Sequence, residues 1–133
     1  MKIYVPPAVV LGTDVFDQFL DDNELRDFAL KSNDDKDLMK KFFIADNFPR
    51  FVVEDMRAFL DLVREPLAVR SSSQLEDSQG QPFAGVYDTF MLPNSHPDPE
   101  VRLKQLFHAI KRIYVSIFFQ KSKDYFKVTT YSL

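Results

Sequence analysis

Apolar side chains recur every three or four residues in four stretches of the chain, and this spacing predicts four amphipathic helices. The first helix is predicted over about Asp14–Asp22 and the last over about Glu100–Lys121. The second and third helices are marked by apolar stripes within residues 38–43 and 52–63. Pro66 follows the third stripe and predicts its end, because proline cannot continue a helix.

Short apolar segments before and between these helices predict β-strands. They are Ala8–Leu11, Leu67–Val69 and Val86–Leu92. Polar and small residues fill positions 70–85, and a loop of that length is usually functional or disordered. The mixed order of strands and helices predicts an α/β or α+β fold, with helices packed on a small mixed sheet.

The composition is that of an ordinary globular protein with an unusual excess of phenylalanine. The chain has 133 residues, enough for one domain, and 14 of them are phenylalanine. So many rings predict either a phenylalanine-rich core or an apolar surface that another segment covers. The formal net charge is -3, which gives no long-range attraction to nucleic acid or to an anionic membrane.

Two absences from the sequence narrow the class of protein further. There is no cysteine, which rules out disulfide bonds and thiolate metal ligands. No apolar run reaches the roughly 18 residues that a membrane-spanning helix needs. We therefore expect a soluble protein of the cytoplasm that has no contact with membranes or nucleic acid.

The segment after the second predicted strand carries the candidate chemistry. Arg70 directly follows that strand, and an arginine at a strand end offers a planar fork of donors that matches phosphate oxygens. Ser71–Ser73 add hydroxyl donors, and Gly85 would let the backbone approach a ligand closely. Thr89 offers a further hydroxyl near any phosphate or sugar that the loop holds. On composition alone, the alternative is a solvated serine-rich turn with a surface arginine.

Four short motifs follow one another in this segment. They are Val69–Ser72, Glu76-Asp77, Phe83–Gly85 and Thr89-Phe90. Their order and spacing closely resemble the ATP-binding signature of the phosphoenolpyruvate synthase and pyruvate phosphate dikinase family. Several matches at the family's spacing in one window are specific, far more so than a lone glycine motif. A looser likeness extends over nearly the whole of the remaining chain.

This resemblance implies an ATP-grasp fold, in which two α/β lobes hold ATP between them. It implies that Arg70 binds the ATP phosphates, that Gly85 lies against the nucleotide through its backbone, and that Thr89 contacts it through its hydroxyl. The parent enzyme would pass phosphate from ATP, through a phosphohistidine on another domain, to pyruvate or a similar acceptor. On this interpretation residues 1–133 are a single partial domain of the ATP-binding region, inactive alone.

Departures from the family pattern limit what this chain is expected to supply. The family's upstream lysine motif has no match here, and its downstream segment, which supplies the Mg²⁺ ligands, would lie beyond Leu133. Glu76 and Asp77 are assigned to shaping the loop, with Mg²⁺ binding beside the phosphates as the alternative. Two other functions stay open. One is a non-catalytic nucleotide-sensing domain, and the other is a related phosphotransferase with another acceptor, such as an antibiotic or a glucan.

The remaining polar candidates carry weaker signals. His96 lies in a proline-rich turn and His108 lies off the apolar face of the last helix, so they make no metal-ligand spacing. Asp34, Asp35 and Asp37 are better explained as a capped helix start than as a cation site. No G-x-S-x-G motif is present for a serine nucleophile. No catalytic residue and no metal ligand is therefore assigned within this chain.

Overall fold

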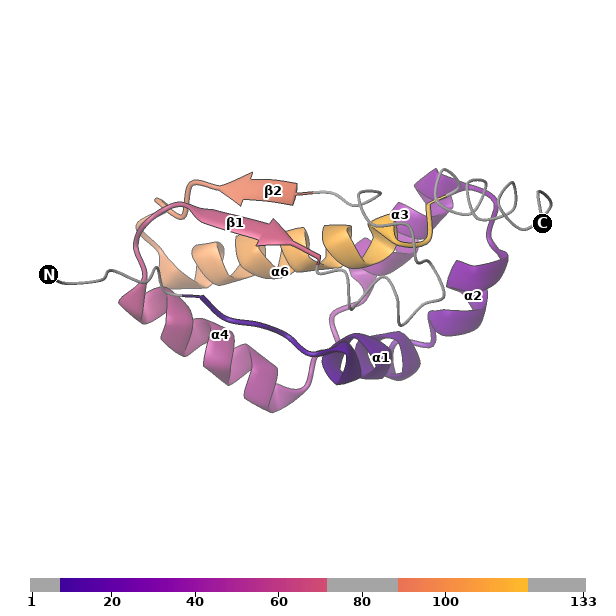
Figure 1. Cartoon of the computed structure of the whole chain (residues 1–133), viewed down its shortest axis with the longest axis horizontal. Helices are drawn as coiled ribbons and strands as arrows, with labels where there is room; N and C mark the ends of the chain where they lie inside the picture. Colours follow the sequence, from indigo (N-terminus) through magenta and orange to yellow (C-terminus); the bar gives the residue numbers. More distant parts are fainter. Residues whose placement is uncertain (1–7, 72–88, 120–133) are drawn as a thin grey trace, which may run out of the picture.

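The computed structural model describes residues 8–71 and 89–119, which form a group of helices with a small sheet on one side (Figure 1). In chain order the elements are α1 (Thr13–Asp22), α2 (Arg26–Lys31), α3 (Asp35–Ile44), α4 (Arg50–Leu62), β1 (Leu67–Arg70), β2 (Thr89–Leu92) and α6 (Pro99–Ser116). The four helices predicted from the apolar stripes are present as α1, α3, α4 and α6, and each buries residues of its stripe. None of the helices in the described part of the chain has the length and hydropathy to span a bilayer.

The strands β1 and β2 form a two-stranded antiparallel sheet that lies against α6. The register pairs Leu67 with Leu92 at one end of the sheet and Arg70 with Thr89 at the other. Figure 1 shows the sheet on one side of α6, with α1 and α4 on the other side and with α2 and α3 gathered near the end of α6. The expected class, helices packed on a small sheet in a mixed α/β arrangement, is confirmed.

A cluster of aromatic rings fills the space between α1, α3 and α6. Phe16, Phe19 and Phe42 are 0% exposed. The ring centroid of Phe16 lies 4.7 Å from that of Tyr114, and the centroid of Phe42 lies 6.1 Å from that of Phe118. Edge-on and tilted ring contacts add attraction beyond the buried apolar area. At these positions the phenylalanine stripes form core, as predicted.

Two buried cations tie α6 to its neighbouring helices. The Nζ of Lys111 donates to the backbone carbonyl of Phe43 and to Oδ1 of Asp46, each at 2.9 Å. The Nη1 of Arg102 donates to the backbone carbonyl of Leu60 at 3.1 Å. Phe43 and Leu60 lie in the last turns of α3 and α4, where carbonyl groups lack intrahelical partners and cations are favourable. These bonds fix the ends of both helices against α6.

The predicted strand at Ala8–Leu11 is wrong. These residues are irregular, and Val9 and Val10 are 45% and 87% exposed rather than buried. A strand needs a neighbour for its hydrogen bonds, and within the described residues β1 and β2 pair only with each other. The apolar composition of this segment predicts a strand, but among the described residues the segment has no neighbouring strand to pair with.

Two helix predictions also need adjustment. The last helix ends at Ser116 rather than near Lys121. Beyond that end the backbone N–H of Phe118 donates to the carbonyl of Val115 at 3.0 Å, three residues back, which is the spacing of a tighter turn. The short helix α2 was not predicted, because Ala29 is its one buried residue and no apolar stripe marks it.

Candidate functional site

Arg70 and Thr89 lie directly opposite each other at one end of the sheet. Arg70 is the last residue of β1, Thr89 is the first residue of β2, and the antiparallel register pairs them. Directly opposed residues project from the same face of a sheet, with Cβ atoms about 4.5–5.5 Å apart. Both residues are exposed. The structure therefore brings together two of the three residues expected to bind nucleotide, and they are called the strand-end pair below.

The alternation of buried and exposed residues along both strands decides which way this pair points. Leu67, Val69 and Leu92 are half-buried and pack against the hydrophobic core, whereas the alternate residues of both strands are exposed. Successive side chains of a strand point to opposite faces of the sheet. Anchoring the apolar residues on the core therefore turns the strand-end pair toward solvent.

Arg70 brings a positive charge to this strand end. Arg70 has no carboxylate partner among the residues that the structure describes. Its guanidinium keeps its charge in proteins and offers five N–H donors in a fixed fork. Ser71 follows it and is buried, and its Oγ has no hydrogen-bond partner within the described residues. A charged fork with hydroxyl groups beside it suits a phosphate group.

The third expected residue, Gly85, lies outside the described residues. The same holds for Ser72, Ser73, Glu76 and Asp77. Their parts in binding nucleotide and in shaping the loop stay predictions from the sequence. The described portion of the site is the strand end alone.

Arg112 on α6 is a further residue near this site, and the apolar pattern of the helix did not single it out. Its guanidinium carbon lies 4.9 Å from the centroid of the Phe90 ring. Phe90 follows Thr89 on β2, so the contact lies next to the strand-end pair. No signal in the sequence points to this contact, because it joins a helix to a strand.

The other polar candidates serve local structure. His96 lies in the exposed turn before α6, and its Nδ1 accepts a hydrogen bond at 3.0 Å from a backbone N–H two residues ahead. The ring of His108 stacks on that of Phe43 with centroids 4.5 Å apart. Asp34 Oδ1 accepts from the N–H of Lys36 at 2.9 Å, which confirms the predicted capped start of α3. Within the described ranges, no group of three or more histidine or acidic residues could hold a metal ion.

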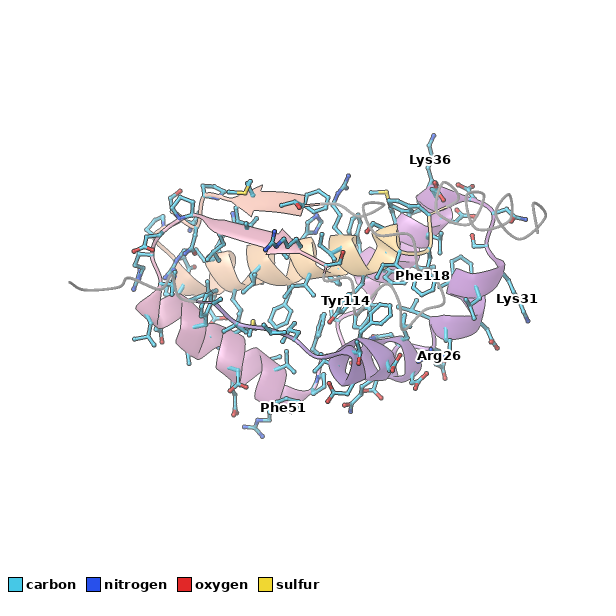
Figure 2. All side chains as sticks on the ribbon, in the orientation of Figure 1. Arg26, Lys31, Lys36, Phe51, Tyr114 and Phe118 are labelled. Carbon is cyan, nitrogen blue, oxygen red and sulfur yellow. The ribbon has the colours of Figure 1, made fainter. Side chains whose placement is uncertain are left out.

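An apolar groove lies on a separate part of the surface, between residues 9–12 and α4. Its volume is about 530 Å³. Val10, Phe51 and Leu62 line it, and all three are exposed. Figure 2 shows Phe51 at the edge of α4 that faces away from the sheet. Neither residue of the strand-end pair lines the groove, so it is not part of the candidate site.

Tyr114 is a further buried ionisable group in the helical part of the molecule. Tyr114 is 4% exposed, and its hydroxyl has no hydrogen-bond partner in the described part of the chain. Burial, with a smaller contribution from the charge of Asp14, raises the pKa of the Tyr114 phenol. Figure 2 shows the ring between α6 and α1. The phenol therefore stays neutral and belongs to the core rather than to the strand end.

Comparison with known families identifies one match for this chain. A family model described as the AMP/ATP-binding domain of pyruvate phosphate dikinase matches residues 1–132. No curated protein and no solved structure matches the chain. The family match thus includes every helix and strand described above, as well as the strand-end pair, and extends well beyond the motifs at residues 69–90.

Proposed function

Because this chain belongs to the family of pyruvate phosphate dikinase AMP/ATP-binding domains, we propose that its strand-end pair binds ATP within a larger phosphotransferase. The observation that carries the proposal is the placement of Arg70 opposite Thr89 at the exposed end of the sheet. In this proposal Arg70 binds the ATP phosphates, Thr89 contacts the nucleotide through its hydroxyl, and Gly85 lies against it through its backbone.

The chemistry of Arg70 supports its proposed role. The planar guanidinium can donate two parallel hydrogen bonds to the oxygens of one phosphate. The residue is exposed, and phosphate binding there would break no ion pair between described residues. During phosphoryl transfer the negative charge is spread over the oxygens around the transferred phosphorus, and a fixed guanidinium stabilises that charge.

The proposed parent enzyme transfers phosphate from ATP, through a phosphohistidine on another domain, to pyruvate or a similar acceptor. Residues 1–133 would be a single partial domain of an ATP-grasp region in a cytoplasmic enzyme. Phosphoryl transfer of this kind uses Mg²⁺ to neutralise phosphate charge. In this proposal the Mg²⁺ ligands are supplied by other parts of the parent enzyme, and no step of the reaction is assigned to a metal on residues 1–133.

Nucleotide titration of the full-length protein tests the proposal. Arg70→Ala should weaken ATP binding by about 1.5–3 kcal/mol, the loss of a hydrogen bond to a charged group. Arg50→Ala is the matched control, because Arg50 lies on α4 with a side chain that is 92% exposed, and it should leave the affinity unchanged. An affinity of Arg70→Ala equal to that of the wild type would contradict the assignment of Arg70.

A second measurement tests whether residues 1–133 need the rest of the proposed enzyme. We expect the purified 133-residue chain to hydrolyse no ATP and to transfer no phosphate, since the acceptor and phosphohistidine domains lie elsewhere in the proposal. Phosphate release from ATP is the readout, with the full-length protein as the positive control. Turnover by the isolated chain would refute this part of the proposal.

A further inference from the structure

The inward-facing residues of the sheet anchor it on the core, except at the start of β2 beside Thr89. Among its inward-facing residues, Leu67, Val69 and Leu92 pack against the hydrophobic core. Phe90, the inward-facing residue next to Thr89, is not among the described residues that form or contact that core. A two-stranded sheet is marginally stable in water unless one of its faces packs against another element. At this end Val69, the register partner of Phe90, anchors β1 on the core, so the start of β2 is the part that depends on a different anchor.

Arg112 of α6 supplies this anchor. Its guanidinium carbon lies 4.9 Å from the Phe90 ring centroid, within the range of cation–π attraction. The helix holds Arg112 firmly, because Lys111 is buried and bonded to the carbonyl of Phe43, and Ile113 is 3% exposed. A planar guanidinium can also stack on an aromatic face, which the ammonium group of lysine does less well. A fixed helix thus covers the one inward ring that the core does not reach.

We infer that Arg112 is a positioning residue for nucleotide binding, acting through Phe90 to hold the start of β2 so that Thr89 stays opposite Arg70. This inference rests on the proposed function. Without the contact, the start of β2 is less restrained and the Thr89 hydroxyl spends less time beside Arg70. Part of the binding free energy is then used to order the strand end. Arg112 contacts the ring and not the nucleotide.

ATP titrations of the full-length protein test the positioning role. Arg112→Met removes the guanidinium but keeps a long apolar side chain, and we expect the affinity to fall about two- to fivefold. Arg112→Lys keeps a cation near the Phe90 ring and should restore part of this loss. Lys104→Met is the matched control, because Lys104 is an exposed cation on the same helix that has no ring or carboxylate partner among the described residues. It should bind ATP like the wild type.

A second arm of the experiment asks whether Arg112 acts through Thr89. In a Thr89→Val background, Arg112→Met should cause little further loss, because the hydroxyl that it positions is already gone. An undiminished loss in that background would overturn the inference, since Arg112 would then act on the ligand through its own charge. Wild-type affinity in the single Arg112→Met variant would overturn it as well.

Thermal unfolding and the Arg70 variant separate this inference from its alternatives. Arg112→Met should unfold at the same Tm as Lys104→Met, and a clearly lower Tm would indicate a general structural role and sink the positioning role. If Arg70→Ala weakens ATP binding and Arg112→Met does not, the positioning role alone is lost. If Arg70→Ala has no effect, the proposed function falls first and this inference falls with it.

Discussion

The helical body, formed by α1, α3, α4 and α6, and the strand end of the sheet hold their cations in different ways. In the helical body, Arg102 and Lys111 are buried and donate to carbonyl groups at the ends of other helices. At the strand end, Arg70 is exposed and Arg112 is half-buried, and neither has a carboxylate partner in the described part of the chain. If the proposed function holds, stability and ligand binding are assigned to separate residues, and substitutions should then separate the two properties.

The largest effect is expected from a substitution in the helical body. Phe42 is 0% exposed, and its ring centroid lies 6.0 Å from that of Phe19. Phe42→Ala should lower the free energy of unfolding by about 3–5 kcal/mol, because it removes a buried ring and leaves a cavity. Urea denaturation measures the change, and Phe51→Ala is the matched control because Phe51 is 55% exposed. If Phe42→Ala lost no more free energy of unfolding than Phe51→Ala, the buried ring would contribute no more to stability than the exposed one.

The next effect tests the bonds that buried cations make with helix ends. Lys111→Met removes the donor to the carbonyl of Phe43 and leaves that end of α3 without this partner. We expect the free energy of unfolding to fall by about 1–3 kcal/mol, the range for a buried group left unpaired. Urea denaturation is again the measurement, with the exposed Lys104→Met as control. Equal stability of the two variants would show that the helix-end bond contributes little.

Much of the helical body could be predicted from the sequence, because each long helix buries an apolar stripe. Such a stripe is visible in the sequence as apolar residues at helical spacing. The buried cations could not be predicted. Arg102 and Lys111 belong to residue types that are seldom fully buried, and each donates to a backbone carbonyl that no side-chain pattern reveals. The strand predicted at Ala8–Leu11 failed for a related reason, since a strand depends on a neighbour that comes from elsewhere in the fold.

The strand end could be predicted in part. Arg70 and Thr89 were identified separately, from the chemistry of arginine and threonine and from the likeness of their segment to a family signature. Their direct opposition was beyond the sequence, because it depends on the register between two strands that are distant along the chain. The contact of Arg112 with Phe90 was equally out of reach, since it joins a helix to a strand.

A smaller effect is expected at the strand end, on binding rather than on stability. Thr89→Val removes the hydroxyl and keeps a β-branched shape that suits an exposed strand position. ATP binding to the full-length protein should weaken by about 0.5–1.5 kcal/mol, while the free energy of unfolding stays within about 0.5 kcal/mol of the wild type. Calorimetric titration and urea denaturation of one preparation measure both. Met91→Ala, on the same strand and 67% exposed, is the control for binding. Lower stability with unchanged ATP affinity would show that Thr89 contributes to stability and not to ATP binding.

The smallest effect is expected for Tyr114→Phe, which changes the helical body alone. The buried hydroxyl has no partner within the described residues, so its removal should raise the free energy of unfolding by up to about 1 kcal/mol near neutral pH.

Burial raises the pKa of the Tyr114 phenol above its ordinary value of about 10, so in alkali the unfolded chain releases this proton first. Titration of this group therefore leaves the free energy of unfolding unchanged below about pH 10 and lowers it as the pH rises further. Urea denaturation at about pH 7 and about pH 10.5 should show a smaller alkaline loss for Tyr114→Phe than for the wild type, with equal ATP affinity. Equal alkaline losses would mean that the hydroxyl is hydrated or bonded in the folded protein.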